Sequence, residues 1–245
     1  MDPHRPSPER AASGRLRHVT ASRLCRAALA VAVAAPCALA VAAEDYSAAE
    51  RAIFMSNHLA NVRPPATLHY RYVKGGSMEA GFEDRVTLRL SARADRSCCS
   101  ANADFLSGER RLALPEVEAA EGNPVLLYFL ERDIREMSRL TKGQQNYFRK
   151  RIRMAVYQAA EQRELTLTYR GKSVPARQFS IAPYVDDPLR ERFAGLSGKR
   201  YTITLSDAVP GGIYAIATRV DADGGAPLWT EEMTLEGAAP APRPH

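Results

Sequence analysis

Residues 68–73, LHYRYV, and residues 82–90, FEDRVTLRL, decide the fold class of this chain. In the first stretch Leu68, Tyr70 and Tyr72 alternate with other side chains, and the second stretch alternates in the same way. A period of two residues is typical of a β-strand that buries one face. Glycines lie between the two stretches, as in the connection of a β-hairpin. The two stretches therefore predict an antiparallel pair of strands.

Further along the chain, a period of about 3.6 residues predicts two long helices. Asn123 caps the start of the clearest one, and Pro124 suits its first helical position. We expect this helix to run to about residue 140 and a second one to cover residues 145–160. A shorter helix is expected at 48–60, and another starts at Asp187-Pro188. The remaining strands are expected at residues 98–105, 110–114, 164–169, 174–181, 199–205, 213–220 and 228–235.

This order of elements predicts an α+β fold with a mainly antiparallel sheet, because the chain does not alternate strand and helix regularly. We expect a curved, half-barrel-like sheet with an inserted helical hairpin, residues 124–160, against its concave face. A doubly wound parallel sheet does not fit this order.

The first 43 residues are typical of a cleavable export signal. Six arginines precede a run of mainly Ala, Val and Leu at residues 27–40, which ends in small residues before Glu44. This pattern matches a secretory signal peptide, and the run is shorter than the roughly 20 apolar residues of a membrane span. Cys37 leaves lipid attachment as an alternative, although Pro36 fits such a signal poorly. We therefore expect an exported, periplasmic protein of the cell envelope.

The expected mature chain is a single domain over residues 44–236 with a disordered Ala/Pro-rich tail over residues 237–245. The whole chain has 34 basic and 28 acidic residues. Six of the basic and two of the acidic residues lie in the signal, so the rest is nearly neutral. A general nucleic-acid surface is therefore not expected.

No sequence motif points to a catalytic or cofactor site. The histidines outside the signal, His58, His69 and His245, do not have the spacing of a helical zinc pair. Nucleophile-elbow and phosphate-loop motifs are also missing. We therefore predict no cofactor, no metal and no catalytic residues, and we expect a binding protein rather than an enzyme.

Cys98 and Cys99 are the cysteines that remain outside the signal. In an oxidising compartment a lone pair usually forms a disulfide, but neighbouring residues can do so only in a strained ring. Two thiols are slightly favoured over a disulfide, and a soft-metal or redox site is the third alternative.

The helical hairpin is predicted to present an apolar stripe toward a groove. Asp133 falls within that stripe, where a buried carboxylate needs a partner. One interpretation is an ion pair with Arg151 or another arginine; the alternatives are a ligand-facing carboxylate or one exposed in a groove. The residues expected to line the ligand-binding groove are Leu126, Phe129, Leu130, Asp133, Phe148 and Ile152.

The densest charge in the chain is the run RKRIR at residues 149–153. Arg149, Lys150 and Arg153 are expected to point away from the apolar face of their helix. Such a run is usually a solvated helix face. The functional alternative is a patch that binds anionic lipid headgroups or another envelope polyanion.

Residues 122–133 and 147–151, together with residues 201–214, resemble an uncharacterised family of exported proteobacterial proteins. That family implies no activity for this chain. The expected architecture is also similar to periplasmic half-barrels of the lipoprotein-carrier type, in which a curved sheet wraps helices and shelters acyl chains.

Together these features favour a periplasmic, non-enzymatic binding or envelope-maintenance protein that shelters a lipid-like or other apolar ligand. The expected partner is an anionic lipid or an envelope protein. One alternative is a hydrolase of an envelope polymer, which needs two carboxylates in a polar cleft. The other is a scaffold or interaction module, which would have a filled core and one exposed apolar patch.

Overall fold

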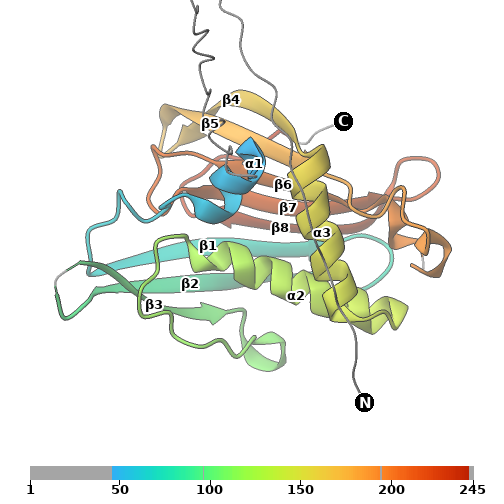
Figure 1. The fold of residues 1–245 in the computed structure, drawn as a ribbon, viewed down its shortest axis with the longest axis horizontal. Coiled ribbons are helices and arrows are strands. Elements are labelled where there is room, and N and C mark those ends of the chain that lie inside the picture. The colour runs from blue at the N-terminus through green and yellow to red at the C-terminus, as the bar shows by residue number, and fades with distance from the viewer. Residues whose placement is uncertain (1–45, 96, 194, 243–245) are drawn as a thin grey trace, which may run out of the picture. The chain divides into compact units, whose positions relative to one another are not determined.

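The computed structural model describes residues 46–95, 97–193 and 195–242, and its centre is one eight-stranded antiparallel sheet (Figure 1). The strand order is β3-β2-β1-β8-β7-β6-β5-β4. The sheet curves around two helices without closing, which confirms the predicted α+β class. The strands are β1 (Ala66–Gly75), β2 (Phe82–Ala92), β3 (Cys98–Phe105), β4 (Glu161–Tyr169), β5 (Lys172–Ile181), β6 (Arg200–Leu205), β7 (Ile213–Asp221) and β8 (Pro227–Leu235).

The predicted hairpin is formed by β1 and β2, which pair from Ala66 opposite Leu90 to Lys74 opposite Phe82. Its alternation has the expected consequence, because Tyr70 and Tyr72 are fully buried. On its other edge β1 pairs with β8, so the first and last strands of the chain are neighbours in the middle of the sheet.

The two predicted long helices are α2 (Pro124–Thr141) and α3 (Gln145–Ala159). Both lie on the same face of the sheet (Figure 1). The Asn123 side chain accepts a hydrogen bond from Val125 N at 3.2 Å, as predicted for a cap. It also donates to Tyr70 Oη at 2.9 Å and to Gly211 O at 2.8 Å. One side chain therefore starts α2 and attaches its first turn to the sheet.

The short segments differ more from expectation. The first helix is only α1 (Ala48–Glu50) followed by a π-helical turn, η1 (Arg51–Met55). The strand expected at residues 110–114 is reduced to a single bridge between Phe105 and Leu112. The helix expected after Asp187 is replaced by short 3-10 turns. The 3-10 turns of the described residues include η2 (Gly108–Arg110), η3 (Arg190–Arg192) and η4 (Leu196–Gly198).

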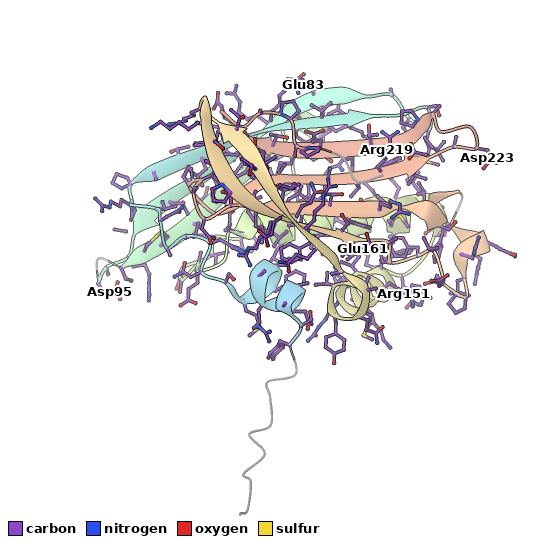
Figure 2. The ribbon with its side chains drawn as sticks, turned by 90° about the horizontal axis from the view of Figure 1, so that it is seen from above. Glu83, Asp95, Arg151, Glu161, Arg219 and Asp223 are labelled. Carbon is purple, nitrogen blue, oxygen red and sulfur yellow. A yellow bond between two sulfur atoms is a disulfide. The ribbon has the colours of Figure 1, made fainter. Side chains whose placement is uncertain are left out.

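The Ala/Pro-rich tail was expected to be disordered, but its described part, residues 237–242, is held by hydrogen bonds. Arg170 N donates to Gly237 O at 2.7 Å, and Ala239 N donates to Thr168 O at 2.9 Å. The backbone of the tail thus pairs with the end of β4, which composition alone does not reveal. Seen from above, the β4–β5 hairpin twists across the sheet (Figure 2).

The predicted signal peptide and its cleavage site lie at residues 1–43, outside the described residues. None of the helices in the described part of the chain is both long enough and apolar enough to cross a membrane.

Candidate functional site

The space between the helical hairpin and the sheet is filled by side chains. Four of the residues predicted to line a groove there, Leu126, Phe129, Asp133 and Phe148, are at most 2% exposed. Aromatic rings pack against them. The ring centroids of Tyr72, on β1, and Phe129 are 6.1 Å apart, and those of Tyr184, in the loop after β5, and Phe148 are 5.7 Å apart. These four residues belong to the core, so the structure does not bring them together around an open groove.

An open groove of about 640 Å³ lies instead on the solvent side of the hairpin, between α2, α3 and the α1–η1 turn. The other two predicted groove residues, Leu130 and Ile152, reach it. Its walls are mostly apolar. The lining residues are Tyr46, Glu50, Phe54, Met55, Ala113, Leu114, Pro115, Leu127, Tyr128, Leu130, Glu131, Ile134, Arg135, Arg149, Ile152 and Arg153.

Large apolar side chains of this groove are exposed to solvent. Leu127 is 57% exposed, Met55 50%, Tyr46 42% and Phe54 37%. A contiguous apolar surface on a folded protein commonly marks an interaction or ligand site, whereas isolated exposed apolar residues do not. The groove is therefore the best candidate site in the described residues.

Two of the three predicted basic residues, Arg149 and Arg153, line this groove. Arg149 forms an ion pair with Glu131, whose Oε1 lies 2.8 Å from Arg149 Nη2 and also pairs with Arg135. Arg153 is exposed and forms no ion pair or hydrogen bond with another described residue. The third, Lys150, is also exposed but does not line the groove.

Asp133 is fully buried and is paired, but not with an arginine. Its carboxylate forms an ion pair with Lys199 and accepts a hydrogen bond from Tyr201 Oη at 2.5 Å. Burial raises the pKa of Asp133, and the positive charge of Lys199 opposes that rise. The predicted partner Arg151 forms an ion pair with Asp187 instead, with 2.7 Å between Arg151 Nε and Asp187 Oδ2. The prediction of a buried ion pair at Asp133 was therefore right, but the predicted partner, an arginine, was wrong.

A second pair lies beside the first. Arg132 of α2 bonds to Glu231 of β8 and donates to Tyr72 Oη at 2.8 Å. Burial alone would raise the pKa of Glu231, but the charges of Arg132 and Lys199 bring it below its ordinary value. The two carboxylates are thus balanced by two cations in the core, and they stabilise the contact between α2 and the sheet.

His58 is buried where the end of η1 approaches the start of α2. Its Nε2 lies 2.8 Å from Ala52 O, and Asn123 N donates to its Nδ1 at 3.3 Å. A carbonyl accepts and an amide donates, so this geometry requires a neutral ring with its proton on Nε2. Burial lowers the pKa of His58 in keeping with that state.

Cys98 and Cys99, at the start of β3, are joined by a disulfide in the structure. The sequence slightly favoured two thiols, but the structure has the disulfide instead. Among the described residues, no group of three or more His, Cys, Asp and Glu side chains is placed to hold a metal ion.

Under the hydrolase alternative, the candidate active site is a polar cleft of about 570 Å³ on the sheet. The carboxylates that line it are Glu83, Asp84, Glu232 and Glu236, together with His69. Hydrogen bonding to Arg71 lowers the pKa of Glu83. For Asp84, burial acts in the opposite direction, but hydrogen bonds from neighbouring groups lower the pKa. A general acid needs a raised pKa, which neither of these two carboxylates has.

Most of the groove, including Tyr46, Phe54, Met55 and Leu127, was not predicted from the sequence. Leu127 could have been found from the sequence, because it is an apolar residue beside the predicted stripe, about 100° around the helix from the stripe residue Leu126. The groove also depends on η1 packing near the hairpin, and no local pattern contains that contact.

No family model matches the chain, and no curated protein is significantly similar to it. Among solved structures, it is similar to the lipoprotein LppX of Mycobacterium tuberculosis, with 8% identity and a TM-score of 0.32. The similarity covers 74% of this chain and 90% of that one. A similarity with a TM-score of this size carries no argument about this chain. The comparisons do not show the expected proteobacterial family.

Proposed function

We propose that this protein is an exported, non-enzymatic binding protein that holds the acyl chain of a lipid-like ligand in the groove between α2, α3 and η1. The observation that carries the proposal is the set of apolar side chains exposed there, led by Leu127 at 57% and Met55 at 50%. Exposing such side chains to water is unfavourable, and an apolar chain laid against them removes that cost.

The size of the groove supports a ligand. Its volume of about 640 Å³ falls within the range of roughly 300–1,000 Å³ that is typical of small-molecule sites. The periplasmic location rests on the predicted export signal at residues 1–43.

An interaction module is the second candidate, because the core beneath the hairpin is filled and the apolar surface lies outside it. A partner segment would then cover the same side chains. The hydrolase alternative would use the carboxylates of the polar cleft, Glu83, Asp84, Glu232 and Glu236. The lowered pKa values of Glu83 and Asp84 do not suit a general acid.

The proposal is tested with N-phenyl-1-naphthylamine, an uncharged dye that fluoresces in apolar sites. The parent should bind the dye, and a long-chain alcohol should displace it. Leu127→Glu should reduce dye affinity at least about tenfold, because it places a charge in the middle of the apolar wall.

Leu189→Glu is the matched control, since Leu189 is 39% exposed and lies outside the groove. It should leave dye binding unchanged. A parent that binds no dye, or equal losses in both variants, would refute the acyl-chain site and favour the interaction module.

A further inference from the structure

One side of α3 carries positive charge that no other described residue neutralises. Lys150, Arg153 and Tyr157 follow one another at intervals of three and four residues, so they lie along the same side of the helix. All three are exposed, Tyr157 by 43%. Lys150 and Arg153 form no ion pair or hydrogen bond within the described residues.

Most other cations of the hairpin have an acidic partner, and the exception is the exposed Lys142 in the turn before α3. Arg135 and Arg149 both bond to Glu131, and Arg139 bonds to Glu136 at 2.9 Å. Within α3, the cations without an acidic partner among the described residues are therefore Lys150 and Arg153.

This charged side adjoins exposed apolar residues. Ser47 Oγ donates to Val156 O at 3.4 Å, which brings the start of α1 against the last turns of α3. Tyr46 lines the groove together with Arg153, and Met55 and Leu127 lie in the same lining. Cations, a tyrosine and apolar side chains therefore share one face of the molecule.

We propose that this face, formed by Lys150, Arg153 and Tyr157 with Tyr46, Met55 and Leu127, docks on the surface of an anionic lipid bilayer. Lysine and arginine lay their apolar stems along a membrane interface while their charges contact headgroups. Tyrosine also favours that interface, and apolar tips enter the boundary of the acyl chains. The docking goes beyond the proposed function and does not require a ligand in the groove.

Anionic lipid is favoured over a neutral surface by charge complementarity. A basic residue near an anionic membrane changes partitioning by about fivefold. Lys150 and Arg153 together are therefore expected to contribute about 25-fold, in a salt-dependent way.

The test is co-sedimentation with vesicles of phosphatidylcholine alone or mixed with phosphatidylglycerol. The parent should sediment with the mixed vesicles and not with phosphatidylcholine, and added salt should release it. Lys150→Glu/Arg153→Glu should weaken binding to the mixed vesicles by about 25-fold or more.

A matched control makes the same change in net charge elsewhere. Lys172, at the β4–β5 turn, and Arg200, at the start of β6, are exposed and have no partner within the described residues. Lys172→Glu/Arg200→Glu should retain most of the binding. Equal losses in the two double variants would overturn the proposal, because net charge rather than this face would then be responsible.

Dye binding separates this proposal from the proposed function. Lys150→Glu alone, at a residue outside the groove lining, should weaken vesicle binding about fivefold and still bind the uncharged dye. The circular dichroism spectrum of Lys150→Glu/Arg153→Glu shows whether the double variant is folded. A parent that binds dye but not mixed vesicles overturns the docking alone, and one that binds vesicles but not dye refutes the acyl-chain site alone. A salt-resistant dimer that these substitutions dissociate, without vesicle binding by the parent, would assign the face to a second copy of the chain.

Discussion

Asp133 is 0% exposed and lies in the core with Lys199, which is equally buried. Taking a single charge out of water costs several kcal/mol, so each of the two groups depends on the other. Tyr201 adds a hydrogen bond to the carboxylate at 2.5 Å. At this position a change of one side chain affects the charge balance of the whole contact between α2 and the sheet.

Asp133→Asn should therefore lower the free energy of unfolding by about 3–5 kcal/mol, because it leaves Lys199 buried without a counter-charge. Urea denaturation followed by circular dichroism measures the change. Asp186→Asn, at an exposed position, is the control and should stay within about 0.5 kcal/mol of the parent. Asp133→Leu/Lys199→Met should recover part of the loss; if Asp133→Asn and the parent unfold alike, the carboxylate is not buried as described.

His58 should make stability depend on pH. Burial lowers its pKa below the ordinary 6.5, with Arg177 acting in the same direction and with the Ala52 carbonyl and Asp207 opposing. Above about pH 6.5 the ring is neutral in both the folded and the unfolded chain, so its contribution is constant there. Below that pH the unfolded chain takes up the proton first, and the folded state loses stability as pH falls.

The expected slope from His58 is at most about 1.4 kcal/mol per pH unit in the window below about pH 6.5. Urea melts at several pH values in this window test it. His58→Gln should remove this part of the pH dependence. An unchanged slope in His58→Gln would show that other groups cause the dependence.

At the scale of elements, α2 is followed by its C-cap residue Lys142, whose backbone is left-handed with a φ of 58°. This conformation is unfavourable for residues with a Cβ atom, and glycine usually occupies it at helix ends. The hairpin needs this turn, because α3 starts only three residues later, at Gln145.

Lys142→Gly should raise the free energy of unfolding by about 0.5–1 kcal/mol, since it relieves the left-handed conformation. Lys150→Gly is the opposing control: it places glycine inside α3 and should cost about 1 kcal/mol. Thermal and urea melts of both variants measure the difference. A loss of stability in Lys142→Gly would mean that the lysine side chain contributes more than the backbone strain costs.

At the scale of the whole molecule, the mature chain is predicted to begin at Ala43 or Glu44. Small residues precede a charged start at this point of the sequence, as signal cleavage requires. N-terminal sequencing of protein from the envelope fraction tests this expectation. Retention of residues 27–40 in that protein would show that the segment is not removed.

Local patterns were sufficient for most elements of the fold. Alternation over residues 68–73 and 82–90 predicted the β1–β2 hairpin, and Asn123 with Pro124 placed the start of α2 correctly. These features depend on neighbouring residues only, because strand period, helix period and capping act within a few positions. The burial of Asp133 could be predicted for the same reason.

The partners and the site were decided by tertiary structure. Lys199 is 66 residues from Asp133 in the sequence, and it reaches the carboxylate from the position just before β6. The groove likewise needs η1 next to a hairpin that starts about 70 residues later. Contacts of this range follow from strand order and from how the helices pack, and periodicity carries no information about either. The same apolar stripe could therefore have lined an open groove or, as in this protein, filled the core.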